Sequence, residues 1–172
     1  FGGSGKHPAR FGFLQVRPMY VSKDVVEVSE QDLVGDRVLV ASEQVLGNGH
    51  VESIRDVVYV KPDAFSAKDT WLIAAELEEM NRHLLEAKRP YLLLVIGRLG
   101  TSDPWLGIPV NWGQVSAAKV VVEASTSSMN VDMSQGSHFF HHVTCLRSLY
   151  FSVDKTGRYP VKWEWLEKQK KK

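Results

Sequence analysis

Short apolar runs separated by polar stretches recur along the chain and predict a set of β-strands. We expect strands at residues 38–41, 57–60, 91–96, 120–122 and 149–153. The run at 91–96, Tyr-Leu-Leu-Leu-Val-Ile, is continuously apolar, as is typical of a strand buried on both faces of a sheet. The run at 120–122, which has alanines on both sides, indicates a second strand of this kind.

A long amphipathic helix is predicted at residues 67–87, with Ser66 as its N-cap and Asp69 three residues on, as in a capping box. Its predicted buried stripe consists of Ile73, Leu77, Met80 and Leu84, and is extended toward the N-terminus by Trp71. Pro90 ends the helix. Because this helix lies between two predicted strands, it indicates a crossover connection and parallel pairing of those strands.

The order of predicted elements is strand, strand, helix, strand, loop, strand, helix, strand. The second helix is expected within residues 136–147, where Phe139, Phe140, Val143 and Leu146 have helical spacing. This order predicts an α/β fold, a compact mixed or parallel sheet with flanking helices. We divide the chain into a lead-in at 1–22, an α/β domain at 23–160, and a C-terminal helix with a basic tail at 161–172.

The net charge, the lengths of the apolar runs and the cysteine count restrict the kinds of partner and compartment that we expect for this protein. The 172 residues carry a net charge of +1, so no overall field selects nucleic acid or an acidic membrane. No apolar run approaches the roughly 20 residues that span a bilayer, and the N-terminus lacks the apolar segment of a signal peptide. One cysteine, Cys145, allows no intrachain disulfide and fits a reducing compartment. We therefore expect a cytoplasmic protein without a nucleic-acid or membrane partner.

The first stretch with candidate chemistry is a predicted strand that ends at Pro18. Gln15 and Arg17 lie two residues apart in it, so their side chains project from the same face of an extended chain. An amide beside a guanidinium can bind phosphate or carboxylate oxygens. The alternative is a surface strand whose two polar side chains bond loop carbonyls.

The second stretch is the loop at residues 97–109, which follows the buried strand at 91–96. Ligands of open parallel sheets bind at the carboxyl ends of the strands, where this loop begins. Arg98 could clamp an anion, Thr101 and Ser102 supply hydroxyls, and Asp103 supplies a carboxylate. The alternative is a structured loop whose Trp105 fills the core.

The third stretch, Ser134–Gln135–Gly136–Ser137–His138, is the expected entry to the second helix. A helix N-terminus favours an anion and lowers the pKa of a histidine there, so His138 could carry a phosphoryl group. His138 and His142 are four residues apart but lack the glutamate of a zinc-protease motif, and no metal site is expected. A structural role for these histidines is the alternative.

Leu14-Gln15-Val16-Arg17-Pro18 resembles the closing strand of the ATP-grasp nucleotide-binding domain of the phosphoenolpyruvate synthase and pyruvate phosphate dikinase family. The order of the later motifs is similar to that of the swivelling phosphohistidine domain that follows it in this family. These motifs are 92–96, Thr101-Ser102-Asp103-Pro104, 117–121, Gln135-Gly136-Ser137-His138 and 149–153.

The resemblance implies that the chain is the C-terminal portion of an ATP-dependent phosphotransferase, and that its main domain is a divergent phosphohistidine-type β/β/α domain. It implies His138 as the phosphoryl acceptor, or His141 in a second register, with Arg98, Ser102, Asp103 and Ser137 around the phosphate. Gln15 and Arg17 would lie at a nucleotide site completed by an upstream ATP-grasp domain.

On this interpretation the partners are the upstream domain and a small-molecule phosphoryl acceptor. ATP and Mg²⁺ belong to the parent protein, and no cofactor is expected in this chain, which should be inactive alone. On the leading hypothesis the domain acts as a phosphohistidine-type or regulatory module. The competing hypothesis is a non-catalytic scaffold or interaction module that has lost the chemistry. It is motivated by the bulky Phe139-Phe140 pair, where the family has small residues.

Overall fold

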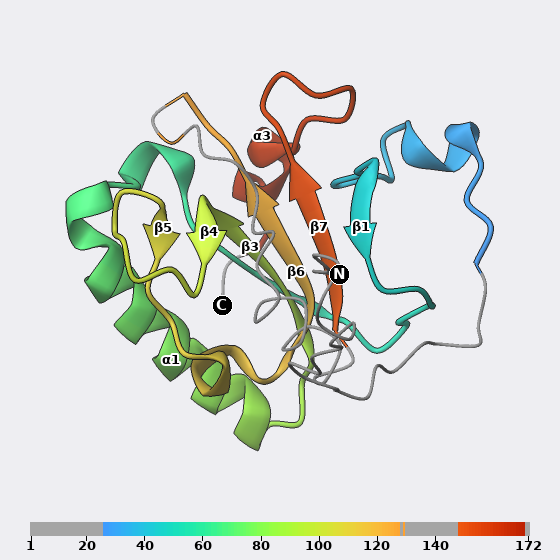
Figure 1. Ribbon diagram of the computed structural model, residues 1–172. Helices are drawn as coiled ribbons and strands as arrows, with labels where there is room; N and C mark the ends of the chain where they lie inside the picture. The colour runs from blue at the N-terminus through green and yellow to red at the C-terminus, as the bar shows by residue number, and fades with distance from the viewer. Residues whose placement is uncertain (1–25, 128, 130–147, 171–172) are drawn as a thin grey trace, which may run out of the picture.

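The computed structural model describes residues 26–127, 129 and 148–170, and these form a five-stranded sheet with the order β1-β7-β6-β3-β2 (Figure 1). The strands are β1 (Gln44–Leu46), β2 (Asp56–Tyr59), β3 (Tyr91–Ile96), β6 (Ala118–Ala124) and β7 (Leu149–Val153). Strands β2, β3, β6 and β7 run parallel, while β1 pairs antiparallel with β7 at the edge. The predicted α/β class with a mixed sheet is confirmed.

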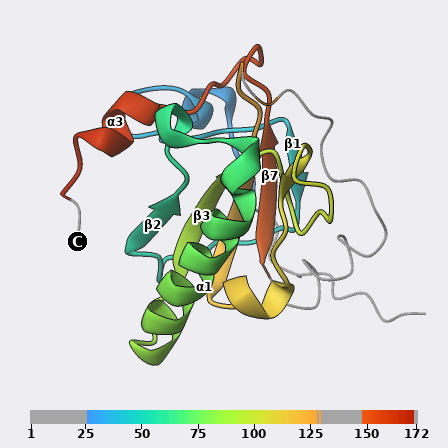
Figure 2. The ribbon, with the colours of Figure 1, turned by 90° about the vertical axis from the view of Figure 1, so that its left-hand side faces the viewer.

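Helix α1 (Thr70–Glu86) connects β2 to β3, so the predicted crossover with parallel pairing is confirmed. The Ser66 hydroxyl accepts a hydrogen bond from the Lys68 amide and caps a 3₁₀ turn, η3 (Ala67–Asp69), that precedes α1. Figure 2 shows α1 lying across one face of the sheet. A single crossover helix therefore covers much of this face.

The face that α1 buries differs in part from the predicted stripe. Its buried residues are Thr70, Ala74, Leu77 and Asn81. The prediction that Trp71 extends the stripe is wrong, because 63% of its surface is exposed, and Met80 is 45% exposed. Apolar spacing misplaced part of the buried face because that face includes Asn81, a polar residue whose partners lie in other elements.

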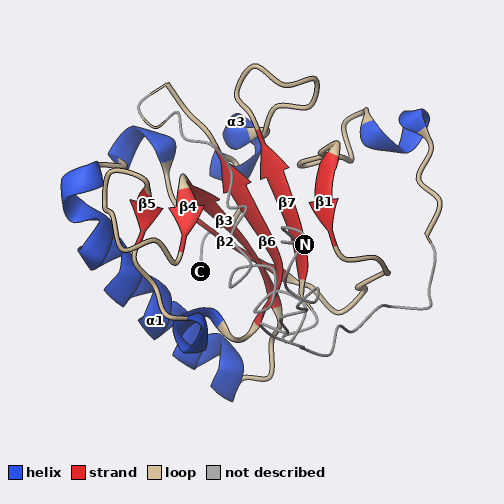
Figure 3. Cartoon of the chain, in the orientation of Figure 1, coloured by secondary structure: helices blue, strands red, loops and turns tan. Residues whose placement is uncertain are grey.

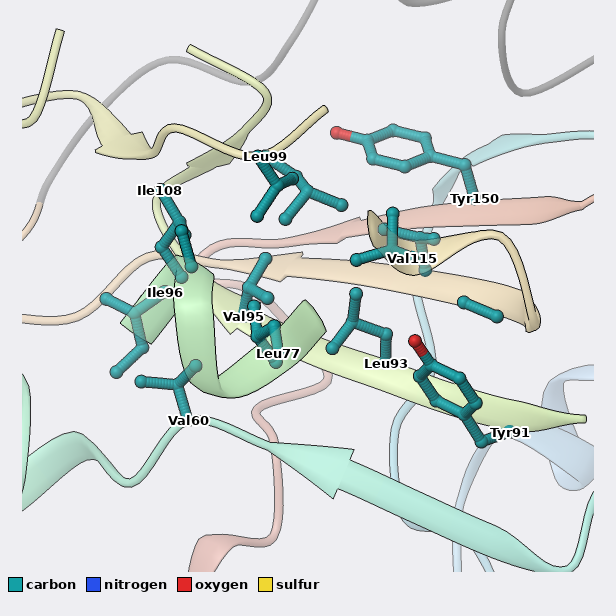
Figure 4. Packing of buried hydrophobic residues seen from close by; sticks show 14 of the residues in the cluster. Val60, Leu77, Tyr91, Leu93, Val95, Ile96, Leu99, Ile108, Val115 and Tyr150 are labelled. Atoms are coloured by element: carbon teal, nitrogen blue, oxygen red, sulfur yellow. The ribbon is translucent and has the colours of Figure 1, made fainter. Parts of the chain in front are cut away.

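Strand β3 separates two hydrophobic clusters, because its side chains alternate between the faces of the sheet. Tyr91, Leu93 and Val95 face α1 in the larger cluster (Figure 4). This cluster also contains residues of β4 (Arg98–Leu99), β5 (Gly107–Ile108) and η4 (Trp112–Val115). Figure 3 shows β4 and β5 as a short separate pair beside the main sheet, next to α1.

The other face of the sheet is covered by both ends of the described chain. Leu94, Val122 and Val153 pack there with Leu166 of α3 (Trp163–Glu167), so the predicted C-terminal helix is confirmed. The predicted strand at 38–41 is wrong. This segment packs on the same cluster through Leu39 and Val40, and the Lys162 amide donates to the Leu39 carbonyl at 3.2 Å. The strand that joins the sheet in this part of the chain is β1, which begins three residues after Ala41.

Two predicted regions lie outside the described residues, namely the helix within 136–147 and the lead-in at 1–22. A short 3₁₀ helix, η1 (Glu30–Leu33), begins the described part of the chain, and η2 (Pro62–Ala64) follows β2. The start of β2 is joined to the segment before β3 by a two-point ion pair. Arg89 donates to both carboxylate oxygens of Asp56 at 2.8 and 2.6 Å.

Asn81 connects α1 to the elements beside it through a buried hydrogen-bond network. Its Oδ1 atom accepts bonds from the Tyr91 hydroxyl at 3.1 Å and from the Ala117 amide at 2.9 Å. Burial raises the pKa of Tyr91, so the phenol stays protonated and remains a donor at neutral pH. One side chain thus satisfies two buried donors and fixes α1 against the start of β3.

We expect Asn81→Leu to destabilise the fold by about 3 kcal/mol, because it keeps the volume but leaves the Tyr91 hydroxyl and the Ala117 amide buried without an acceptor. Tyr91→Phe is the matched comparison. It removes a donor together with its need for a partner and should cost about 1 kcal/mol. Urea unfolding followed by circular dichroism measures both. Equal losses for the two variants would contradict this account of the network.

Candidate functional site

The carboxyl ends of β3, β6 and β7 meet at one edge of the sheet, where Figure 1 shows their arrowheads side by side. A polar residue follows each strand: Arg98 after β3, Ser125 after β6 and Asp154 after β7. The Gly97 amide donates to the Ala124 carbonyl, and the Ser125 amide to the Val153 carbonyl, both at 3.0 Å. These bonds continue the strand pairing into the connections. We call Arg98, Ser125 and Asp154 the carboxyl-edge residues.

The loop at 97–109 is held by a close approach of its own backbone. Arg98 pairs with Gly107 in the short β4–β5 ladder, and the Arg98 amide donates to the Leu106 carbonyl at 2.8 Å. Gly107 has φ +154°, and a Cβ atom there would lie 2.0 Å from the Arg98 carbonyl oxygen. Only glycine permits this contact, which fixes the backbone of Arg98 beside β3.

The other predicted residues of this loop lie near its tip. Ser102 and Asp103 are exposed, and Thr101 is half-buried. Asp103 stabilises its own turn: its Oδ1 atom accepts a bond from the Trp105 amide at 2.9 Å, and its carbonyl accepts one from the Leu106 amide at 3.0 Å. The interpretation of Trp105 as a core residue is wrong, since 68% of it is exposed. Ile108 fills the core instead and is fully buried.

His138, His141 and Ser137 lie outside the described residues, as do Gln15 and Arg17. The structure does show how the chain leaves β6. The Thr126 amide donates to the Met129 carbonyl at 2.9 Å, and the Met129 amide donates back to the Thr126 carbonyl at 3.3 Å. Met129 is buried, and its Cγ atom lies 3.1 Å from the position that a Cβ of Gly97 would take. Residue 129 therefore packs directly beside the start of the loop that contains Arg98.

Glu123, in β6, is a candidate that the sequence interpretation missed. It is 1% exposed, and its two carboxyl oxygens accept bonds from the Leu99 amide and the Tyr150 hydroxyl, both at 2.8 Å. It lies on the face of the sheet that α1 covers, opposite Val95 of β3 in the strand register. Glutamate is seldom fully buried, so a glutamate directly after the apolar run 120–122 was the signal that could have identified it.

Asp154 and Ser125 form a polar pair between the ends of β6 and β7. The Ser125 hydroxyl donates to Asp154 at 3.3 Å and accepts a bond from the Lys155 amide at 3.0 Å. Hydrogen bonds from the side chain and then the backbone of Thr156 hold the pKa of Asp154 below its ordinary value. Asp154 is therefore a carboxylate at neutral pH, and its oxygens close the turn that follows β7.

The carboxyl edge of the sheet thus carries the guanidinium of Arg98, the hydroxyl of Ser125 and the carboxylate of Asp154. The buried carboxyl group of Glu123 lies one residue before the end of β6. An anionic ligand could bind at Arg98, while Asp154 at the other end would repel it. Among the described residues, no group of three or more His, Cys, Asp or Glu side chains could hold a metal ion. None of the helices in the described ranges has the length and apolar character needed to cross a membrane.

In comparisons with protein-family models, with curated protein sequences and with solved structures, no match to this chain was found.

We expect Gly107→Ala to destabilise the fold by at least about 2 kcal/mol, because the new Cβ would overlap the Arg98 backbone and the φ angle disfavours alanine. Gly113→Ala is the matched control, because its Cβ would meet no atom within 4 Å. Denaturant unfolding measures both variants. A Gly107→Ala protein as stable as the control would contradict the close approach of the two backbones.

We expect Thr156→Val to raise the pKa of Asp154 toward its ordinary value, because it removes the largest cause of the shift. The lowered pKa stabilises the fold above the pKa of the unfolded chain, and this contribution is lost as pH falls through the folded-state pKa. The variant should therefore lose stability at neutral pH but not at a pH below both values. NMR titration of the Asp154 Cγ resonance gives the pKa. Thr101→Val should leave it unchanged.

Proposed function

We propose that this chain is the C-terminal portion of a phosphoenolpyruvate-synthase-like, ATP-dependent phosphotransferase, and that its α/β domain is a phosphohistidine-type module. His138 is the proposed phosphoryl acceptor, with His141 as the alternative. The observation that supports this best is the Gly97–Ala124 hydrogen bond. It joins the loop that contains Arg98 to the end of β6, the strand whose continuation leads in sequence to both histidines.

Packing of Met129 against Gly97 adds to this support, because it places a residue five positions after the end of β6 beside the start of the Arg98 loop. The parallel arrangement of β3, β6 and β7 also supports the proposal, since ligands of such sheets bind at the carboxyl edge. The specific swivelling β/β/α architecture is part of the proposal. It accords with the central parallel strands and with a second small sheet, β4–β5, on one side.

The proposed step is transfer of one phosphoryl group. A neutral imidazole nitrogen attacks phosphorus, a P–N bond forms, and the P–O bond to the departing donor breaks. Arg98 would neutralise the charge on the phosphoryl oxygens, with Ser102 and Ser137 as hydroxyl donors. Asp103 would act on the loop and not on the phosphate, since its carboxylate accepts the Trp105 amide and repels anions.

The upstream ATP-grasp domain is the proposed partner, and a small molecule is the final phosphoryl acceptor. Gln15 and Arg17 would contact the nucleotide only inside that complete domain, which would also bind ATP and Mg²⁺. We further propose that the protein acts in the cytoplasm, without nucleic-acid or membrane partners. A non-catalytic interaction module is the second candidate function. It is favoured by Trp105, which exposes 68% of its surface at the tip of the loop.

The test uses the protein that contains both the nucleotide-binding domain and this chain, incubated with ATP labelled with ³²P on its β and γ phosphates. We expect label on the protein that is lost in acid and stable in base, as phosphohistidine requires. His138→Asn should abolish it, and His141→Asn should leave it in place. The reverse pattern would assign His141 as the acceptor.

The surface residue His83 of α1 supplies the matched control, since His83→Asn changes an exposed histidine outside the loop and the carboxyl-edge residues. No label on the wild-type protein would contradict a carrier role and favour the interaction module. Label that persists in the His138→Asn, His141→Asn double variant would also exclude both histidines as acceptors.

A further inference from the structure

Glu123 is a fully buried carboxyl group for which the proposed phosphoryl transfer has no direct use. Burial of a carboxyl group among apolar side chains is unfavourable unless hydrogen bonds compensate for lost hydration. Here both oxygens accept a bond of 2.8 Å. Because the buried carboxyl group needs both of these bonds, it holds its two donors, the Leu99 amide and the Tyr150 hydroxyl, in fixed positions.

One donor is the amide of Leu99, the residue that follows Arg98 in β4. The Arg98 amide and the Gly100 amide both bond to backbone carbonyls of the loop at 2.8 Å, to Leu106 and Ile108 respectively. The Leu99 amide points away from that ladder and reaches Glu123 in the main sheet instead. Glu123 thus links the backbone beside Arg98 to strand β6 through a side chain, in addition to the backbone bond between Gly97 and Ala124.

The second donor, the Tyr150 hydroxyl, extends the link to β7. Tyr150 is 3% exposed and pairs with Val121 in the strand register, so its ring has a fixed place on the same face of the sheet. One carboxyl group therefore connects β4, β6 and β7. Arg98 begins β4, and Ser125 and Asp154 directly follow β6 and β7.

We propose that Glu123 is the positioning residue for Arg98, because its carboxyl group fixes the Leu99 amide and thereby sets where the neighbouring guanidinium meets an anionic phosphate group. This proposal rests on the proposed function for the identity of the ligand. Glu123 itself touches no substrate. It acts through the backbone of β4, and Tyr150 holds its second oxygen in place.

Two variants separate positioning from folding. Glu123→Met removes both acceptors at similar volume, whereas Glu123→Gln keeps one oxygen that can still accept the Leu99 amide. We expect Glu123→Met to lower the rate of phosphoryl transfer about tenfold or more, and Glu123→Gln to recover part of that loss. Glu86→Gln, on the exposed end of α1, is the control with no expected effect.

A double-variant cycle with Arg98→Ala decides how Glu123 acts. If it works through Arg98, Glu123→Met should have almost no further effect on transfer in the Arg98→Ala background. A role confined to folding would lower transfer by the same factor in both backgrounds, and that result would overturn the proposal.

Hydrogen exchange provides a readout that does not depend on activity. In the 172-residue chain, Glu123→Met should speed exchange of the Leu99 amide about tenfold relative to Glu86→Gln, with the Leu94 and Val121 amides unchanged. Unchanged exchange at Leu99 would overturn the positioning role. Absence of phosphoryl label from the wild-type protein would instead refute the proposed function, and the Leu99 amide would still report whether Glu123 fixes this backbone.

Discussion

Burial of β3 on both faces of the sheet is the interaction on which the rest of this structure depends. Tyr91, Leu93, Leu94, Val95 and Ile96 are all fully buried. Their alternation creates the two hydrophobic clusters, one under α1 and one under α3. A strand without solvent exposure requires a neighbour at each edge and a covering layer on each side. Strands β2 and β6 are its parallel neighbours at the two edges, α1 covers one face, and α3 covers the other.

Buried polar groups give this apolar arrangement a unique geometry. Asn81 satisfies donors from β3 and from the segment before β6, and Glu123 satisfies donors from β4 and β7. Each side chain joins elements that hydrophobic contact alone would allow to slide against one another. Hydrogen bonds of this kind contribute little net stability, but leaving one unmade is costly, so they select one register among similar packings.

Much of this fold could be predicted from the sequence, because the apolar runs at 91–96, 120–122 and 149–153 and the helix after Ser66 are local signals. The failures have a common cause. Whether Trp71 or Trp105 is buried, and whether residues 38–41 join the sheet, depends on which other segments arrive beside them. The candidate site was predictable only in part. Arg98 could be placed at a strand end, but the bonds of Glu123 join residues far apart in sequence. Gln15, Arg17, Ser137, His138 and His141 stay predictions.

The antiparallel edge strand has a consequence for how the chain folds. Strand β1 pairs only with β7 among the described residues, and the Ser42 hydroxyl bonds to the Ser152 carbonyl, 110 residues away in sequence. During synthesis β1 leaves the ribosome well before its hydrogen-bonding partner β7. Closing so long a loop is entropically costly and slow. The nascent chain therefore keeps β1 unpaired until β7 has been synthesised, and during that interval β1 is an open edge with which another chain can pair.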